Sequence, residues 1–377
     1  MKAILIIIIV SIFLTSCSAE KVQSSGNNCQ LEVVSSLTPD SLLFEEHRAV
    51  ILETNDNSLL SGIDKIIEWN NVFYILDRRM KQIVLFDTNG KYLNRVHRVG
   101  NGPGEYVDLF DMALDKEKST LLLLASPSSL HFYSLEGKYI DSQSLSGYYS
   151  SLSVVDEYIY LENATYVNDK QSDTSITVLH GKDRVELLKS QEEIAPYCVP
   201  RGYSLNETGL FTRRFDDTIY RLNERGVRSE YVVDFDVEQF PKDSKNKIYE
   251  CGELSEYTRK NALVYSMTDL LETEDRIIFR TNLFEGLYLL DKNEQKVMHY
   301  KRMMNTDYNF PLSNYMPIYG AKDCICFINK APSLYSMKKL CMDNPSFKEK
   351  LLPSFVSLLQ NVDEDSNPIL FYYKIKK

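Results

Sequence analysis

Positive charge is in short supply in this chain. Its 43 Lys and Arg residues face 53 Asp and Glu residues, which gives a net charge of −10, and no basic stripe is visible. A nucleic-acid-binding protein carries such a stripe, so the composition predicts no nucleic-acid partner. Apolar runs long enough to cross a membrane are also missing. The longest, residues 3–14, covers about a dozen residues, whereas a spanning helix needs about 20.

The usual signatures of catalytic and metal sites are absent too. There is no G-x-S-x-G motif, and Cys324-x-Cys326 has no second Cys/His pair beside it, as a zinc site would require. The histidines show neither metal-ligand spacing nor a shared place in a repeat; they are His47, His97, His131, His180 and His299. We therefore predict no catalytic residue, no metal site and no cofactor.

The N-terminus has the features of an export signal. Lys2 supplies a short positive region, residues 3–14 an apolar region, and the tetrapeptide LTSC then ends at Cys17. This tetrapeptide resembles a bacterial lipobox, which predicts a lipoprotein signal peptide over residues 1–17 with lipidation at Cys17. The alternative is an ordinary signal peptide with a chance cysteine.

A polar stretch rich in Gly, Ser and Asn follows, so residues 18–40 are predicted to be a flexible tether. Ser18, in place of an Asp, favours the outer membrane over the inner one. The predicted location is the cell envelope, as an outer-membrane lipoprotein, and either a periplasmic or a surface-facing position fits these residues.

Some of the remaining cysteines could pair in an oxidising compartment. They are Cys29, Cys198, Cys251, Cys324, Cys326 and Cys341. Reduced, packed thiols are the favoured interpretation, because the two side chains of Cys324 and Cys326 would share one side of a strand and stand too far apart along it to bond easily.

Internal repeats dominate the rest of the chain. VLFDTNGKYL (84–93) and HFYSLEGKYI (131–140) share an aromatic residue, a turn ending in Gly-Lys-Tyr and a following apolar residue. Weaker copies continue the series at intervals of 42 to 47 residues, with one interval of 68 that carries an insertion; the repeated positions are Phe86, Tyr133, Val178, Tyr220, Tyr288 and Tyr335. Several short strands per unit at this period predict blades of a β-propeller.

The whole pattern predicts an all-β protein, a six-bladed β-propeller over residues 41–377 with two short helical insertions. The insertions are expected at about residues 254–270 and 345–361. The ring is expected to close by pairing the strand HRAVILET (47–54), the final strand NPILFYYKIKK, or both within the last blade, because closure removes exposed strand edges.

Several segments together resemble a known family. YILD, FDTNGKYL, VGNGPGEY and DSNPILFYYKIKK are similar to the six-bladed β-propeller lipoproteins of Bacteroidetes, and the segment GNGPGEYVDLFDMALD resembles an NHL repeat. The resemblance implies the propeller fold and an envelope location. It implies no activity, because this family is of unknown function.

The glycine-rich segment near residue 100 does not fit a phosphate site. The third glycine comes one residue too early for a dinucleotide-binding motif, and a proline stands where a backbone N–H would be needed. We interpret it as the crossover turn from one blade to the next. Its residues are Gly100, Gly102, Pro103, Gly104, Glu105 and Tyr106.

Candidate ligand-binding residues lie in connections between strands. Arginines after strands suit carboxylates or sulfates, tyrosines can stack on sugars or peptides, and carboxylates stand at one strand start. The candidates are Arg78, Arg79, Asp108, Asp111, Tyr148, Tyr149, Arg213 and Arg214. We expect non-catalytic binding of a glycan, a peptide or an envelope protein. The alternative is a metal-dependent hydrolase or lyase, similar to a lactonase, with Ca²⁺ or Zn²⁺ in the central channel.

Overall fold

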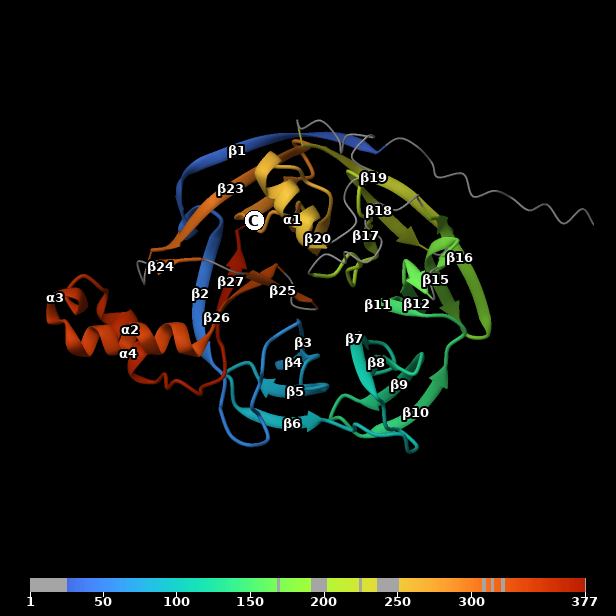
Figure 1. Cartoon of the computed structure of the whole chain (residues 1–377), viewed down its shortest axis with the longest axis horizontal. Helices are drawn as coiled ribbons and strands as arrows, with labels where there is room; N and C mark the ends of the chain where they lie inside the picture. The colour runs from blue at the N-terminus through green and yellow to red at the C-terminus, as the bar shows by residue number, and fades with distance from the viewer. Residues whose placement is uncertain are drawn as a thin grey trace, which may run out of the picture.

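The chain folds as a mostly β protein whose sheets are arranged in a ring (Figure 1). This computed structural model describes residues 26–167, 170–190, 202–223, 226–235, 251–306, 310–312, 315–319 and 323–376. Within them, no helix is long and apolar enough to cross a membrane.

Three consecutive segments of the chain each form a four-stranded antiparallel unit. The strands of the first are β3 (Lys65–Trp69), β4 (Val72–Asp77), β5 (Gln82–Asp87) and β6 (Tyr92–Val96). The second has β7 (Asp108–Asp115), β8 (Thr120–Ser126), β9 (Ser129–Ser134) and β10 (Tyr139–Ser144). The third has β11 (Tyr149–Val155), β12 (Tyr158–Asn163), β15 (Thr174–His180) and β16 (Asp183–Lys189).

The first strand of each unit lies near the ring centre and the fourth at the rim (Figure 1). Middle strands such as β4 and β8 are buried over nearly their whole length, whereas the rim strand β10 is largely exposed. Apolar side chains of neighbouring sheets meet face to face: Tyr74 and Leu85 of the first unit share a core cluster with Leu109 and Leu123 of the second. Each sheet thus buries its faces against its neighbours.

The next two units contain β17 (Leu210–Thr212), β18 (Thr218–Asn223) and β19 (Gly226–Asp234), then β20 (Met267–Glu272), β21 (Arg276–Thr281), β22 (Leu287–Asp291) and β23 (Lys296–Asn305). In the three-stranded unit an isolated bridge between Leu205 and Phe211 stands where the first strand would be. Three very short strands lie outside these units. β13 (Tyr166–Val167) pairs with β14 (Lys170–Gln171), and β24 (Phe310–Pro311) pairs with β23.

The two ends of the chain meet in one unit. It consists of β25 (Tyr315–Tyr319), β26 (Cys324–Asn329), β27 (Ile369–Ile375) and the N-terminal strand β2 (Phe44–Ile51), in the order β2-β27-β26-β25. The antiparallel pairing of β2 with β27, for example Val50 opposite Leu370, confirms the predicted joining of both ends in the last unit.

The predicted flexible tether over residues 18–40 is wrong for its second half. Residues 27–39 form β1 (Asn27–Pro39), followed by a short 3-10 helix at Asp40–Leu42. β1 runs parallel to β19 through residues 27–30 and to β23 through residues 30–39, so it bridges the rims of two units (Figure 1). The segment is polar because only one side of it is covered: Cys29 is buried, whereas Val33 and Leu37 are about half exposed.

α-Helices occur at two places in the described chain. α1 (Cys251–Asn261) ends well before the predicted limit of residue 270, because Met267–Glu272 forms the inner strand β20. The second insertion is longer than predicted: α2 (Ala331–Asp343), α3 (Pro345–Lys348) and α4 (Pro353–Gln360). Tyr335, predicted to be a strand residue of the sixth repeat, lies in α2 instead, and β27 supplies the strand.

The glycines of the two Gly-Lys-Tyr turns have a positive φ. Gly90 and Gly137 have φ values of +90° and +84°, a region in which glycine meets no steric penalty. The crossover interpretation is also confirmed: residues 97–107 link β6 of one sheet to β7 of the next, and the Glu105 carboxylate accepts a 2.8 Å hydrogen bond from the Gly102 N–H. Tyr106 is fully buried there.

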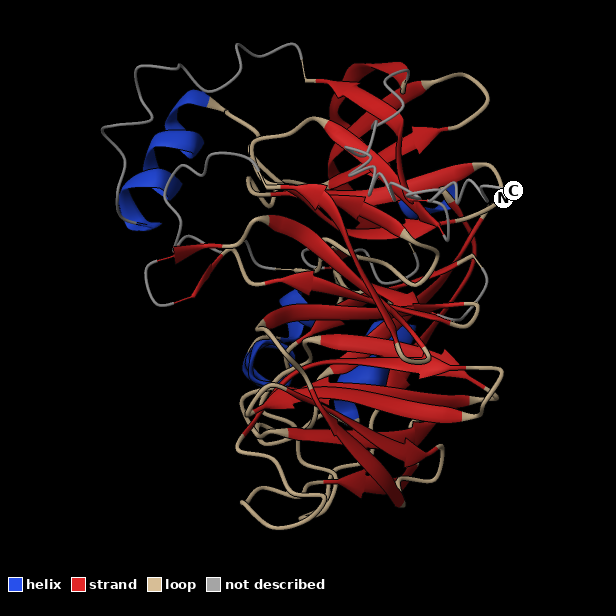
Figure 2. Cartoon of the chain, turned by 90° about the vertical axis from the view of Figure 1, so that its right-hand side faces the viewer, coloured by secondary structure: helices blue, strands red, loops and turns tan. Residues whose placement is uncertain are grey.

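The alternation of antiparallel strands gives the ring two distinct faces. The links between second and third strands lie on one side of the ring, and so do the links from one unit to the next. We call this side the connection face. Hairpins between first and second and between third and fourth strands leave from the other, the hairpin face. Both helical insertions belong to connection-face links, and in side view α1 stands out from one face while the C-terminus lies at the opposite side (Figure 2).

Cys29, Cys324, Cys326 and Cys341 are buried and form no disulfide bond. Burial raises the pKa of Cys29 and of Cys324 to about 11, so both are neutral thiols at pH 7.

A candidate binding site at the ring centre

Charged residues gather where the inner strands begin, at the connection face. Lys65 is the first residue of β3, and its Nζ lies 2.9 Å from the Asp111 carboxylate of β7. The other oxygen of Asp111 accepts hydrogen bonds from the Ser151 hydroxyl at 2.8 Å and from the Leu152 N–H at 2.7 Å. Because Lys65 and Asp111 are both buried, this ion pair joins three consecutive units at their inner ends.

Tyr203 crosses the centre of the ring. In sequence it stands just before the Leu205–Phe211 bridge of the fourth unit, but its ring contacts residues of the first unit. Lys65 Nζ lies 4.7 Å and Arg78 Cζ 5.9 Å from the ring centroid. The side chain is 6% exposed, and its hydroxyl has no hydrogen-bond partner. Burial, with a further contribution from Asp111, raises the pKa of Tyr203 well above its ordinary value, so the hydroxyl keeps its proton.

The position of Tyr203 depends on its neighbour and on the inner strand β20. The Tyr203 N–H donates to the Asp269 carboxylate at 3.0 Å, and the Asp269 N–H donates to the Tyr203 carbonyl at 2.7 Å. Gly202 has a φ of +106°, and a Cβ there would lie 2.5 Å from Asp269 Oδ2. Only glycine permits this close approach of the two segments.

Two arginines flank this centre. Arg280 of β21 donates through Nε to Asp269 at 2.8 Å, and its guanidinium lies 5.8 Å from the ring centroid of Phe284. Arg78, after β4, donates through Nε and its backbone N–H to Asp64 at 2.9 and 2.8 Å. We call the set Asp64, Lys65, Arg78, Asp111, Tyr203, Asp269, Arg280 and Phe284 the central cluster.

A carboxyl group beside the central cluster has an unusual environment. Glu162, near the connection-face end of β12, is half-buried, and desolvation raises its pKa, while hydrogen bonds from Ser204 and Ser150 and the charge of Arg214 act in the opposite direction. A carboxyl with a raised pKa near an arginine is a feature that functional sites share with structural ion-pair networks.

The structure brings together part of the predicted site. Arg78 and Asp111 belong to the central cluster, and Arg214 lies near Glu162 and 6.0 Å from the ring centroid of Phe215. Arg79 and Tyr148 lie in connection-face links, Asp108 is the first residue of β7, and Tyr148 is 59% exposed.

Two of the predicted residues are not available to a ligand. Tyr149 is buried in the core beside Leu152 and donates to the Ser146 carbonyl at 3.1 Å, so it offers no stacking surface. Arg213 is mostly buried and bonds to Asp216 and to the Tyr220 hydroxyl, both at 2.6 Å. It holds the β17–β18 link in shape. Cys17, the predicted lipidation site, lies outside the described residues.

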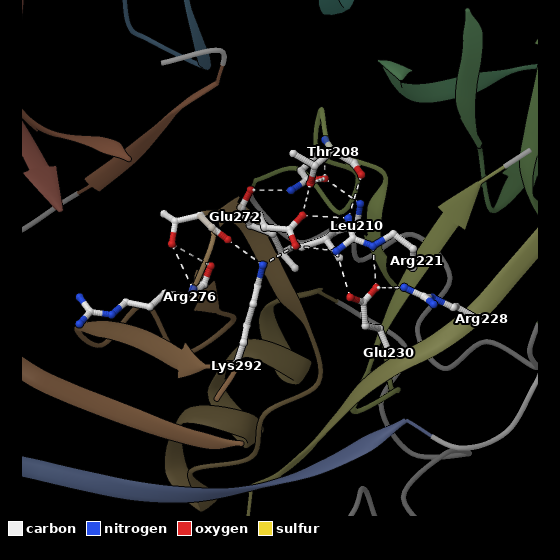
Figure 3. A network of polar contacts seen from close by, with 11 residues as sticks. Thr208, Leu210, Arg221, Arg228, Glu230, Glu272, Arg276 and Lys292 are labelled. Carbon is white, nitrogen blue, oxygen red and sulfur yellow. Dashed lines mark hydrogen bonds and ion pairs between the residues drawn. The ribbon is translucent and has the colours of Figure 1, made fainter. Parts of the chain in front are cut away.

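A second polar network lies at the hairpin face, between the fourth and fifth units (Figure 3). Arg221 contacts Glu230 and Glu272, each at 2.6 Å, and Lys292 contacts Glu272 at 2.7 Å. Burial would raise the pKa of Glu272, but the hydrogen bonds and charge of Arg221, with Lys292 and Thr208, outweigh it and lower the pKa to about 2. The charged groups of this network are paired with one another, and the network thereby joins the fourth and fifth units.

Within the described chain, no group of three or more His, Cys, Asp or Glu side chains is placed to hold a metal ion. A surface hollow of about 480 Å³ lies at the rim, along β10, and is lined by Thr120, Phe132, Ile140, Asp141, Ser142 and Gln143. It is remote from the inner strands that carry the central cluster.

Sequence reasoning missed Lys65, Tyr203, Asp269 and Arg280. A glycine stands directly before a tyrosine at two corresponding places, Gly147 before Tyr148 and Gly202 before Tyr203. This recurrence could have singled out Tyr203. No local signal indicates its partners, because they come from units far apart in the sequence.

The chain is similar to proteins of known structure across its length. A predicted exported protein from Bacteroides fragilis matches with a TM-score of 0.75 at 20% identity, over 94% of this chain and all of that one. A member of the DUF4221 family from Bacteroides vulgatus matches with a TM-score of 0.52 at 12% identity, over 89% and 98% of the two chains. At these identities the likeness concerns the fold alone.

A curated relative and a family model complete the comparison. The relative is the non-toxic nonhemagglutinin type C of Clostridium botulinum C phage, 21% identical over 363 residues; the match covers 90% of this chain, which spans only 28% of that protein's length. The family model that matches residues 32–374 is that of DUF4934, a domain of unknown function. The match extends from β1 to β27, and the chain therefore belongs to the DUF4934 family.

Proposed function

We propose that this chain is a six-bladed β-propeller lipoprotein, exported and held at the outer membrane through Cys17. Its role is to bind a glycan, a peptide or an envelope protein through the connection face, without catalysis. The exported relative from Bacteroides fragilis supports the location, and the ring of antiparallel units closed by β2 and β27 supports the propeller.

The observation that carries the binding proposal is the central cluster. Arginines and aromatic rings converge there from units at opposite sides of the ring. The carboxylates of the cluster are each engaged by a cation: Asp64 by Arg78, Asp111 by Lys65 and Asp269 by Arg280. These ion pairs hold the cationic and aromatic groups in fixed positions in which they can contact a ligand.

The test is thermal unfolding of a chain that begins at Ser18 and so lacks the lipid anchor. A ligand that binds only the folded state raises the melting temperature, so the protein is screened against glycans, envelope peptides, Ca²⁺, Zn²⁺ and a chelator. The shift given by a true ligand should be lost in an Arg78→Ala/Tyr148→Ala variant. It should be kept in Val185→Ala, which changes an exposed residue of the rim strand β16.

Two outcomes would count against the proposal. A ligand shift that survives the double variant and disappears in the rim variant would place binding elsewhere. A melting temperature that falls with chelator and recovers with Ca²⁺ or Zn²⁺ would favour the metal-dependent hydrolase or lyase.

A further inference from the structure

Large aliphatic side chains are exposed on the connection face of the first unit, where three links of the chain come together. Leu59 belongs to the link that leads into β3, Met80 to the link between β4 and β5, and Val99 and Val107 to the crossover from β6 to β7. Each of the four side chains is 41–46% exposed. A single exposed aliphatic residue is ordinary, whereas a contiguous group marks a binding surface.

Hydrogen bonds between the links show that the group is contiguous. The Gln82 side-chain amide donates to the Leu59 carbonyl at 2.8 Å, and Lys81 Nζ donates to the Val107 carbonyl at 2.9 Å. Met80 comes directly before these two donors in the chain. The link that carries Leu59 and the link that carries Val107 are therefore both bonded to the turn that carries Met80.

The second valine is held to the same turn. Val99 forms an isolated β-bridge with Tyr106, and the Tyr106 hydroxyl donates to the Lys81 carbonyl at 2.9 Å. Because Tyr106 is fully buried, this crossover is fixed to the core. We call Leu59, Met80, Val99 and Val107 the apolar patch.

Two arginines beside the apolar patch have no ion-pair partner among the described residues. Arg79 directly precedes Met80, Arg98 directly precedes Val99, and both side chains are exposed. Three carboxylates close to the patch are already engaged: Asp64 with Arg78, Asp108 with Lys81 at 4.0 Å, and Glu105 with the Gly102 N–H. Arg79 and Arg98 are thus left to pair with carboxylates that a partner supplies.

We infer that the apolar patch is the docking surface for an envelope protein whose contact segment carries acidic and apolar side chains. The patch buries the apolar side chains of that segment, and Arg79 and Arg98 bind its carboxylates. This rests on the proposed binding function and names the place and the chemistry of the partner. Apolar residues at the centre with polar residues around them, and an enrichment in Met and Arg, are features of protein interfaces.

A glycan suits this surface less well than a protein does. The four exposed side chains of the patch are aliphatic, whereas the flat C–H faces of sugars stack on aromatic rings. Burial of aliphatic groups against one another is the larger favourable contribution here, and it requires a partner with apolar side chains of its own.

The test is fluorescence anisotropy of the chain beginning at Ser18 with a labelled peptide in which Glu and Leu alternate. One control peptide replaces Glu by Lys, and the other replaces Leu by Ser. The Glu/Leu peptide should bind at least about tenfold more tightly than either, because charge attraction and apolar burial both contribute. Its advantage over the Lys/Leu peptide should disappear at about 1 M salt, where the screening length falls to about 3 Å.

Exchanging the charge of the surface gives the sharpest readout. Arg79→Glu/Arg98→Glu should weaken binding of the Glu/Leu peptide more than about tenfold and should make the Lys/Leu peptide the tighter ligand. A folding defect would not produce this reversal. Met80→Ser should weaken the Glu/Leu peptide as well. The matched control is Arg228→Glu/Val185→Ser, which changes an exposed arginine and an exposed valine of the outer strands β19 and β16 and should leave both affinities unchanged.

Three results would overturn the inference. They are no binding of the Glu/Leu peptide, binding that Arg79→Glu/Arg98→Glu leaves unchanged, and binding of phosphatidylglycerol vesicles in place of the peptide, which would make the surface a lipid contact. The broader proposal has its own outcome. It stands if another ligand of the thermal screen loses its shift in the Arg78→Ala/Tyr148→Ala variant, and it fails if neither the peptide nor any screened ligand binds.

Discussion

Single residues decide the geometry of the ring centre. Gly202 lets the segment carrying Tyr203 approach β20 so closely that any side chain at residue 202 would overlap Asp269. The Tyr203 N–H then donates to the Asp269 carboxylate and the Asp269 N–H to the Tyr203 carbonyl, and the Tyr203 ring reaches the residues of the first unit across the centre. One residue without a side chain therefore positions Tyr203 within the central cluster.

Gly202→Ala should destabilise the protein and weaken ligand binding together. The positive φ alone costs about 1–3 kcal/mol, and the overlap with Asp269 adds to it. The measurement is urea unfolding, followed by titration of a ligand found in the thermal screen. Gly62→Ala is the control, because a Cβ at residue 62 meets no atom within 4 Å and its φ is not in the positive region. Equal stability of the two variants would contradict the account of Gly202.

Glu272 should make the stability of the ring sensitive to acid. Its pKa is lowered from 4.5 to about 2 in the folded protein, a difference on the order of 3 kcal/mol. Because the folded pKa is the lower one, this stability is complete above about pH 4.5 and is lost as the pH falls toward 2. Glu272→Gln should therefore lower the free energy of unfolding at pH 7 and flatten its decline between pH 4.5 and 2.

The control for that titration is Glu364→Gln, whose partner Lys339 is 3.9 Å away and whose side chain is mostly exposed. Exposed pairs contribute little, so its pH profile should follow that of the wild type. A Glu272→Gln profile that also follows the wild type would show that the network in Figure 3 is electrostatically neutral for stability.

At the scale of the element, β1 acts as a belt. It covers the outer edges of β19 and β23, which would otherwise present unpaired N–H and C=O groups, and it buries Cys29 and Thr38. The strand is parallel to both partners, so it joins two units that are not otherwise continuous at the rim. Its polar composition suits a strand that is covered on one side only.

Removing the belt should destabilise the ring without abolishing its closure. A chain beginning at Asp40 lacks β1 but keeps β2, whose pairing with β27 closes the last unit. The free energy of unfolding should fall by several kcal/mol, which should lower the melting temperature by roughly 10 °C. The control is a chain beginning at Gly26, which keeps β1 and should melt like the mature protein. An unchanged melting temperature after loss of β1 would mean that the belt adds no stability.

At the scale of the whole molecule, the prediction concerns attachment. Cys17→Ala should move the protein from the membrane fraction to the soluble fraction, because the proposed lipid anchor is attached to the Cys17 thiol. The measurement is cell fractionation with labelling by a radioactive or clickable fatty acid. Membrane association and lipid labelling that persist in Cys17→Ala would remove the lipoprotein proposal. Cys29→Ala is the control, since Cys29 is buried in β1.

The sequence by itself determined the repeat and therefore the arrangement of units. Alternating apolar residues and Gly-Lys-Tyr turns are local patterns, and they indicated the third strands at Phe86, Tyr133, Val178, Tyr220 and Tyr288. The dependence on local patterns also explains why the sixth repeat was placed wrongly. Tyr335 follows a strand as the earlier repeats do, yet Pro332 favours the start of a helix, and the last third strand comes from β27.

Only the tertiary structure decided the belt and the central cluster. β1 is polar and pairs with strands roughly 200 and 270 residues away, so no neighbouring residue indicates that it is ordered. Lys65, Asp111, Tyr203 and Asp269 come from different units and meet because closing the ring brings all inner strands to one axis. A local sequence pattern specifies a unit, whereas contacts at the axis and the rim depend on how the units are assembled.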